Sequence, residues 1–362
     1  MDTTDPDIQF DQYGNCSNCN NWHLKYRNVR YTKNESEAKW KQYVEHIKLN
    51  SLGNKYNCIV GISGGVDSSY VAYLCKLQGL RPLLVHMDNG WDTEIAVSNI
   101  NKVARSLELD YVSCVLDWEE FRDIQLAFLK ASSVDLEMPT DIAIVASIYK
   151  IARVNNIKYI ISGGNITSEG MLPLQWGYHR YKDLRYYKYI VQNYSKTKIK
   201  EVPSIGILKE SAYRFIYGMK TLYILNYHDY NKDKAKKLLI EELGWKDYGG
   251  KHHESRITSF WHGYAMFEKF GMDYRRPTLS SQICSGHVLR DEALEILRSC
   301  PYSEDKIIED KKYISKKLNM SVGELENYLK KPGRTYVDFP NNKPLIDFCY
   351  SIYNKYLNNK RV

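Results

Sequence analysis

No stretch of the sequence is apolar over enough residues to cross a lipid bilayer, which takes about 20. The longest apolar stretch, residues 204–226, is broken by four charged side chains: Lys209, Glu210, Arg214 and Lys220. The chain opens with acidic and polar residues, Met1 to Pro6, which do not resemble a secretory signal peptide. We therefore expect a cytoplasmic protein without a membrane partner.

Cysteine is scarce and scattered, with eight residues among 362. This usage argues against a disulfide framework and favours a reducing compartment. One pair, Cys16 and Cys19, has the Cys-x-x-Cys spacing of half a tetrahedral zinc or iron–sulfur site. No second such pair exists, so a complete site requires Cys284 or Cys300 to lie nearby in the fold. The prediction is a zinc ion at Cys16, Cys19 and Cys284; an unmetallated loop and a redox pair are the alternatives.

Charge of one sign is nowhere concentrated, although the formal net charge is +8. The densest basic run, Lys232 to Lys237, alternates with apolar residues as the solvated face of a helix does. A nucleic-acid-binding surface is therefore not expected. With 362 residues, 43% of them hydrophobic, the chain can bury a full core in one large domain with appendages.

The most informative stretch is a glycine-rich loop, Ser-Gly-Gly-Val-Asp-Ser-Ser at residues 63–69. It follows an apolar run at 58–62 that predicts a buried strand and precedes helical periodicity over 68–78. Paired glycines allow a tight turn, and the free N–H groups at a helix start attract anions. The loop lacks the lysine of a Walker A loop and the Gly-x-Gly-x-x-Gly of dinucleotide sites. Its form resembles the PP-loop of ATP pyrophosphatases, with a plain Gly-Ser turn as the alternative. The predicted ATP contacts here are Ser63, Gly64, Gly65, Asp67, Ser68 and Ser69.

Strands and helices alternate along the first half of the chain. Apolar runs predict strands at 82–87, 111–116 and 159–161, and periodicity predicts helices at 94–107, 121–131 and 142–154. This order is typical of a doubly wound parallel α/β sheet, in which ligands lie at the carboxyl ends of the strands.

Two stretches follow those strand ends, and a third opens a helix. The backbone around Met87 is predicted to contact adenine, with an ordinary turn as the alternative. A second glycine-rich loop, Gly163-Gly164-Asn165, is expected to face the same crevice. At the start of the helix over 142–154, Thr140 or Asp141 is either a helix cap or, for Asp141, a functional carboxylate.

The second half of the sequence contains a tyrosine- and tryptophan-rich segment, residues 171–230, that reads as a lobe over the crevice or as core. Residues 251–256, Lys-His-His-Glu-Ser-Arg, gather groups that bind anions and move protons. The tail is helical, with a capping-box pattern at Ser321 and Glu324. The expected units are an N-terminal cysteine-containing segment at 1–50, an ATP-binding domain at 51–170, a substrate lobe at 171–300 and a helical tail at 301–362.

Taken together, these stretches resemble the N-acetyl sugar amidotransferase family, PP-loop enzymes of bacterial O-antigen and pseudaminic- or legionaminic-acid pathways. The matching landmarks span most of residues 10 to 305. They are Ser63–Ser69, Asn89–Trp91, Pro139–Asp141, Gly163–Asn165 with Glu169, Gly244–Trp245, Lys251–Arg256 and Ser280–Arg290. The resemblance implies an adenine nucleotide α-hydrolase-like fold with a mainly helical C-terminal part.

The resemblance also implies a reaction: an ATP-dependent C–N ligase converts a sugar acetamido group to acetamidino, releasing pyrophosphate and AMP, with Mg²⁺ as cofactor. Asp67 is expected to fix the loop or the magnesium. Lys251 and Arg256 are expected to neutralise phosphate or a sugar carboxylate, and His252, His253 or Glu254 to handle the protons of ammonia. The implied substrate contacts are Asn89, Trp91, Asp141, Glu169, Arg256 and Arg290.

No Cys lies in a Gly-x-Cys-x-Gly setting, so ammonia is expected from a separate glutaminase subunit, with a cyclase-like channel subunit as a further partner. Two departures from the family are visible. A further Cys-x-x-Cys usually precedes the Asp-Thr at Asp2-Thr3, and its lack means an earlier natural start or a reduced metal site. Residues 276–279 replace a segment that often carries His. The competing readings are a tRNA-thiolating or lysidine-forming PP-loop enzyme and a catalytically silent nucleotide-binding scaffold.

Overall fold

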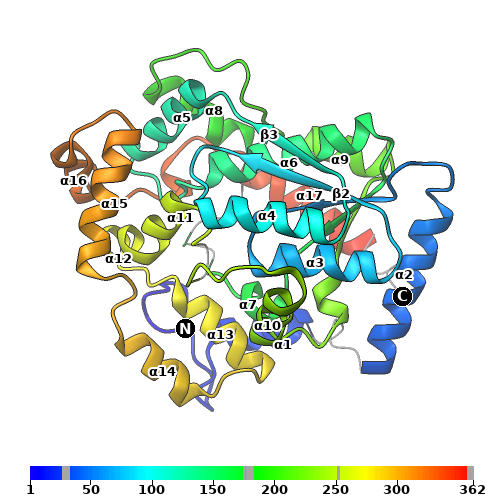
Figure 1. Cartoon of the computed structure of the whole chain (residues 1–362). Coiled ribbons are helices and arrows are strands. Elements are labelled where there is room, and N and C mark those ends of the chain that lie inside the picture. The colour runs from blue at the N-terminus through cyan, green and yellow to red at the C-terminus, as the bar shows by residue number, and fades with distance from the viewer. Residues whose placement is uncertain (27–32, 174–175, 177–182, 251–252, 357–362) are drawn as a thin grey trace.

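A five-stranded parallel sheet lies at the centre of the computed structural model, which describes residues 1–26, 33–173, 176, 183–250 and 253–356 (Figure 1). The strand order is β3-β2-β1-β4-β5. The strands are β1 (Cys58–Gly61), β2 (Pro82–Asp88), β3 (Tyr111–Val115), β4 (Tyr159–Ser162) and β5 (Lys220–Tyr223). The chain winds outward from β1 in both directions, so the predicted doubly wound α/β fold is confirmed, and the topological switch point lies between β1 and β4.

The edge strand β5 was not predicted. It pairs in parallel with β4, with Ile160 opposite Thr221 and Ile161 opposite Leu222. Only Leu222 of its four side chains is buried. An edge strand this short and polar leaves no apolar run in the sequence, which is why periodicity could not reveal it.

Helices cover both faces of the sheet. The first face carries α5 (Trp118–Lys130) and α6 (Met138–Val154), and the second carries α3 (Val66–Leu77), α4 (Glu94–Ser106) and α10 (Lys232–Leu243). Alternate residues of β1 point to opposite faces of the sheet: Ile59 packs in the core on the first face and Val60 in the core on the second. Because both faces are covered, β1 is a continuous apolar run in the sequence.

Each long helix begins where its sequence supplies a cap. Thr93 caps α4 by accepting from the N–H of Ala96, and Asn231 caps α10. Helix α6 is different, because it begins after Glu137 without a side-chain cap. The interpretation of Thr140 or Asp141 as its cap is therefore wrong. Asp141 lies inside the first turn, with its backbone N–H on the carbonyl oxygen of Glu137.

Shorter helices complete the N-terminal half and the segment of 171–230. They are α1 (Ser17–Tyr26), α2 (Lys33–Leu49), α7 (Ile166–Glu169), α8 (Leu184–Tyr194), α9 (Ile207–Phe215) and the 3₁₀ turn Ile224–Tyr227. Four aromatic side chains described in this segment are buried in the core, Trp176, Tyr186, Tyr187 and Tyr230, whereas Phe215, Tyr217 and Tyr223 are exposed. Packing therefore accounts for part of the aromatic content.

The C-terminal part is helical, as predicted. Its elements are α11 (Arg256–Phe260), a π-helical turn (Trp261–Ala265), α12 (Met266–Phe270), α13 (Arg275–Ser285), α14 (Arg290–Arg298), α15 (Glu304–Lys317), α16 (Val322–Lys330), a 3₁₀ turn (Tyr336–Asp338) and α17 (Lys343–Tyr356). The capping box at Ser321 and Glu324 is present at the start of α16. Among the described residues, no helix combines the length and the apolar content needed to cross a bilayer.

Candidate active site

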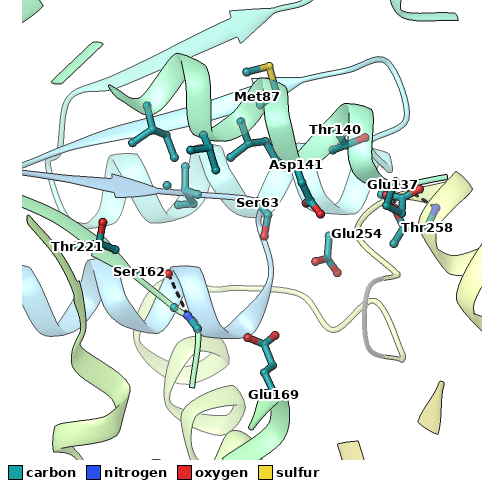
Figure 2. A pocket seen from close by; sticks show the side chains of 18 of the residues that line it. Ser63, Met87, Glu137, Thr140, Asp141, Ser162, Glu169, Thr221, Glu254 and Thr258 are labelled. Atoms are coloured by element: carbon teal, nitrogen blue, oxygen red, sulfur yellow. Dashed lines mark hydrogen bonds between the residues drawn. The ribbon is translucent and has the colours of Figure 1, made fainter. Parts of the chain in front are cut away.

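A cavity of about 670 Å³ lies where the chain crosses from β1 to β4, at the carboxyl ends of these strands (Figure 2). Its walls include the end of β1, the end of β2, the first turns of α6, the loop after β4 and the start of α11. Side chains of α9, β5, the π-helical turn and the start of α13 also contribute to the lining. This is where ligands bind in open parallel sheets. Among the predicted ATP contacts, Ser63, Met87, Gly163 and Gly164 line it.

The first glycine-rich loop is held in one shape by its surroundings. Gly64 has a φ of +78°, and a Cβ at this residue would lie 2.3 Å from the carbonyl oxygen of Ala96. Only glycine fits there. The carbonyl oxygen of Gly64 accepts from the indole N–H of Trp245 over 3.0 Å and from the side-chain amide of Asn99 over 3.4 Å. The loop is therefore fixed to the helices that flank it.

Hydroxyl groups satisfy the amides inside the loop. The N–H of Ser63 donates to Oγ of Ser68 over 3.2 Å, and the N–H of Gly65 donates to Oγ of Ser63 over 3.3 Å. Gly65 is the N-cap of α3 and supplies no side-chain cap. Such an arrangement leaves the helix start open to an anion. The exception is Ser69, whose side chain is fully buried instead of facing the cavity.

The side chain of Asp67 points toward Tyr230, which lies just before α10. The hydroxyl of Tyr230 donates to Oδ1 of Asp67. Burial raises the pKa of Tyr230, and the charge of Asp67 raises it further, so the phenol stays protonated as a donor. This bond ties the loop to the segment that precedes α10.

The structure brings the second glycine-rich loop against the first. A Cβ at Gly163 would lie 3.1 Å from the carbonyl carbon of Asp67 and 3.2 Å from the backbone nitrogen of Ser68. Asn165 shapes this loop by capping α7, where its Oδ1 accepts from the N–H of Ser168 over 3.0 Å. Glu169, at the end of α7, lines the cavity.

Carboxylates form an acidic wall beside the glycine-rich loops. Figure 2 shows the carboxyl groups of Asp141, Glu169 and Glu254 turned toward the space beside Ser63. Burial raises the pKa of the Asp141 carboxyl well above its ordinary value, and the charges of Glu137, Asp135 and Glu169 raise it further. An acidic wall facing an anion-binding loop suits a ligand that carries both signs of charge.

Glu254 reaches the cavity because two distant loops pair. Asp92 and Ser255 form an antiparallel bridge. The N–H of Thr93 donates to the carbonyl oxygen of Glu254, and the N–H of Arg256 donates to that of Trp91, each over 2.9 Å. The loop after β2 thus presents Glu254 to the loop after β1.

Several predicted substrate contacts have other partners. Trp91 is fully buried in the core instead of lining the cavity, and its indole N–H donates to Gln125. Arg256 binds Asp310 over 2.6 Å and also Glu309, so α15 holds its guanidinium. Arg290 lies exposed at the first residue of α14.

Of the remaining predicted residues, one lines the cavity, one is bonded to a neighbouring backbone amide and two are not described by the structure. Asn89 lines the cavity, and its side-chain amide donates to Thr140 over 3.3 Å. His253 accepts from the N–H of Gly250 through Nδ1 over 3.1 Å. Lys251 and His252 lie outside the described residues.

The cysteine prediction is corrected in part. Cys16 Sγ lies 3.3 Å from Cys19 Sγ. The bond with Cys16 lowers the pKa of Cys19, but contact with Cys284 and burial outweigh it, so this pKa is raised. The three cysteines therefore gather in the fold. Within the described ranges, however, no three or more Cys, His, Asp or Glu residues are placed to hold a metal ion, so zinc at this position is not supported.

Sequence reasoning missed two histidines that line the cavity. His86 is buried in β2, with Nδ1 3.0 Å from the carbonyl oxygen of Ile62 and Nε2 3.1 Å from Oδ2 of Asp92. Burial lowers the pKa of His86, but the hydrogen bond and charge of Asp92 outweigh it, so the pKa is raised. The signal was available: a titratable residue inside an apolar strand requires a partner.

The second missed histidine is His262, in the π-helical turn. Its ring stacks on that of Tyr274 at a centroid distance of 4.0 Å, and both line the cavity. Short π-helical turns are frequent at functional sites because they re-aim one side chain. Hydrophobic periodicity in the sequence does not predict such a turn.

Comparison with known proteins gives two family matches. Residues 35–132 match the NAD synthase family, and residues 254–355 match the LPS biosynthesis protein WbpG-like, C-terminal domain. No curated protein sequence matches the chain.

Three solved structures are similar to it. The NH3-dependent NAD synthetase from Campylobacter jejuni has 21% identity and a TM-score of 0.30, and the match covers 41% of this chain and 63% of that one. The NMN synthetase from Francisella tularensis has 13% identity and a TM-score of 0.31, covering 62% and 100%. The U34-tRNA thiolase NcsA from Methanococcus maripaludis has 14% identity and a TM-score of 0.33, covering 74% and 85%. The chain thus spans less than two thirds of the length of the first.

Each family match contributes part of the cavity. The NAD synthase match contains the Ser-Gly-Gly-x-Asp-Ser loop after β1, and the WbpG-like match begins at Glu254, which also lines the cavity. The lining residues between Glu137 and Tyr223 lie outside both matches. Together the two matches support the N-acetyl sugar amidotransferase family of the PP-loop superfamily.

Proposed function

We propose that this protein converts the acetamido group of an N-acetylated sugar into an acetamidino group, using ATP and ammonia. The observation that carries the proposal is one cavity in which two unlike walls meet. Contacting glycine-rich loops form the first wall, and the carboxylates of Asp141, Glu169 and Glu254 form an acidic wall that adjoins it. The reaction needs both, because it starts from a polyanion and ends with a cation.

The first wall suits the activation step. An amide carbonyl oxygen is a poor leaving group, so it must first attack the α-phosphorus of ATP. The bond between the α-phosphorus and the bridging oxygen breaks, pyrophosphate leaves and the amide proton is lost, which gives an O-adenylyl imidate. The loop at Ser63 to Ser68 binds the negative charge that develops on the leaving pyrophosphate.

The acidic wall suits the second step. Ammonia attacks the imidate carbon, the carbon–oxygen bond breaks and AMP leaves. The nitrogen carries positive charge during the attack, and the amidine product is a cation at neutral pH. Carboxylates near that carbon stabilise this charge, and Glu254, which lines the cavity, accepts a proton from the attacking nitrogen in this proposal.

Magnesium fits the donor set. This ion prefers oxygen ligands and usually binds through one or two carboxylates together with substrate phosphates. Glu254 and Glu169 are the carboxylates nearest to the two glycine-rich loops, since a Cβ at Gly65 would lie 3.5 Å from the first and a Cβ at Gly164 3.6 Å from the second. These residues would hold the ion, which supplies charge neutralisation at the phosphates.

The proposed setting is bacterial surface-glycan or flagellin-glycan biosynthesis, with a pseudaminic- or legionaminic-type sugar as one substrate class. The proposed partner is a glutaminase that supplies ammonia, accompanied by a cyclase-like channel subunit. The WbpG-like match supports this setting in general terms.

The test is a product assay on the purified protein. With ATP, Mg²⁺, ammonium and an N-acetylated diamino-sugar nucleotide or nonulosonic acid, we expect AMP and pyrophosphate in equal amounts and a sugar whose mass falls by about 1 Da as oxygen is exchanged for NH. ADP and phosphate as products would overturn the mechanism. AMP formation that requires tRNA instead of a sugar would favour the tRNA-modifying alternative.

A further inference from the structure

The start of α3 has a polar neighbour from outside the glycine-rich loop. The hydroxyl of Tyr248 would lie 3.1 Å from a Cβ placed on Gly65, the residue that precedes α3. Two amides of the loop, those of Ser63 and Gly65, donate to the loop's own hydroxyls, Oγ of Ser68 and Oγ of Ser63. Tyr248 therefore adds a phenol to this group of amides and hydroxyls.

The fold fixes this tyrosine in place. Its ring packs edge-on against Trp245 at a centroid distance of 5.4 Å, and the indole of Trp245 is bonded to the carbonyl oxygen of Gly64. Lys246 is bonded through its backbone N–H and carbonyl oxygen to the side chain of Asn99, each over 2.8 Å. Residues 245–248 are thus attached to the loop at several points.

A phenol hydroxyl in this position carries a proton that it can donate to an anion. Burial raises the pKa of Tyr248, and the nearby charge of Glu254 raises it further, so the proton stays on the phenol. Phosphate oxygens only accept hydrogen bonds, so a phosphate group bound beside the loop is a suitable acceptor for this proton.

The loop also needs such a donor. It has no lysine of the Walker A kind, so its own residues provide amides and serine hydroxyls alone. A leaving pyrophosphate gains charge during the reaction and requires more donors than the ground state does.

We propose that the Tyr248 hydroxyl is a direct ligand of the pyrophosphate that leaves ATP, donating a hydrogen bond to a phosphate oxygen. The tyrosine keeps its proton throughout, so no covalent bond changes at it. This assignment rests on the proposed function, in which ATP is cleaved between its α- and β-phosphates.

The experiment compares Tyr248→Phe with the wild type in calorimetric titrations of inorganic pyrophosphate and, separately, of AMP. Phenylalanine keeps the ring against Trp245 and removes only the hydroxyl. A hydrogen bond to a charged group is worth enough that we expect pyrophosphate to bind about 10- to 100-fold more weakly. AMP should bind within about twofold of wild type, because it does not occupy the leaving-group position.

The matched control is Tyr43→Phe, which removes a phenol hydroxyl from the same core layer at a tyrosine that packs on Tyr227. It should leave both titrations unchanged. Equal pyrophosphate affinity in Tyr248→Phe and wild type would overturn the assignment, and so would a parallel loss of AMP and pyrophosphate affinity, which marks a purely structural role. Product inhibition by pyrophosphate in the AMP-forming assay gives a second measure of the dissociation constant of pyrophosphate.

The outcomes separate this assignment from the proposed function. Wild-type binding of pyrophosphate that depends on Tyr248, without turnover of any sugar, would refute the sugar reaction and support the ligand. Wild-type protein that binds no pyrophosphate would refute both.

Discussion

The indole N–H of Trp245 donates to the carbonyl oxygen of Gly64 over 3.0 Å, although the two residues are 181 positions apart in sequence. The bond fixes the glycine-rich loop to the segment that follows α10. Trp245→Phe keeps most of the ring and removes this donor. We expect the free energy of unfolding to fall by about 1 kcal/mol, the usual worth of such a bond, and ATP to bind more weakly. Urea unfolding and nucleotide titration measure the two effects.

Trp40→Phe is the matched control for that change. Trp40 is buried in the same core layer, and within the described residues its indole nitrogen has no hydrogen-bond partner. Removing an unsatisfied donor costs nothing in hydrogen bonding. A loss of stability as large as that of Trp245→Phe would show that packing of the ring, and not the bond to Gly64, is responsible.

Gly64→Ala should abolish turnover. The new Cβ would lie 2.3 Å from the carbonyl oxygen of Ala96 at a φ of +78°, so the loop must shift. A displacement of about 1 Å typically costs around 100-fold in rate, and we expect at least that loss of AMP formation. Gly218→Ala is the control, because Gly218 also has a positive φ, +68°, but no neighbour within 4 Å of the new atom. It should cost about 1–2 kcal/mol of stability and no activity.

The contribution of His86 to stability should depend on pH. Its folded pKa is raised, with Asp92 as the main favourable partner and Asp88 a smaller one. The stabilisation is therefore complete below the unfolded pKa of 6.5 and is lost as the pH rises through the higher folded value. The difference in unfolding free energy between wild type and His86→Asn should be larger at pH 5.5 than at pH 9. A difference that grows with pH would contradict the bonding described for this ring.

Asp141→Asn should make the protein more stable and less active. Burial and three neighbouring carboxylates raise the pKa of Asp141 in the folded state, so its charge opposes folding above the ordinary carboxyl range. The amide removes that cost, and the gain in melting temperature at pH 7 should shrink as the pH falls toward 4. Activity should drop because the acidic wall loses a charge. Unchanged AMP formation would remove Asp141 from the site.

Arg256→Lys separates two interpretations of this residue. A substrate contact would raise KM and leave stability alone. The structure instead places the guanidinium on the buried Asp310, on Glu309 and over the ring of Tyr313 at 4.0 Å. Lysine cannot reproduce the planar fork, so we expect a lower melting temperature with KM for the sugar unchanged. Thermal unfolding and steady-state kinetics on one preparation decide between them.

The sequence allowed the central strands and the loop at Ser63 to be predicted, because both depend on local chemistry. A strand buried on both faces is an apolar run, and a phosphate loop is a fixed set of small residues. The acidic wall was only partly visible: Asp141, Glu169 and Glu254 were singled out from the sequence, whereas Glu137, whose charge helps to raise the pKa of Asp141, was not. Trp91 and Arg256 were assigned to the substrate because they lie in stretches that resemble the family, and such a resemblance does not say which side chains face a cavity. Adjacent residues of an extended segment point to opposite sides, so Asp92 lines the cavity while Trp91 is buried in the core. Arg256 is held instead by Glu309 and Asp310 of α15.

The antiparallel bridge between Asp92 and Ser255 has a consequence for engineering. A chimaera joined at residue 254, where the C-terminal family match begins, would inherit one half of a two-stranded ribbon and leave the other half on the discarded parent. The acceptor's own loop after β2 would then have to provide N–H and carbonyl groups in the register of Trp91 and Thr93. Substrate specificity can therefore be exchanged between relatives only when both strands of that ribbon come from the same parent.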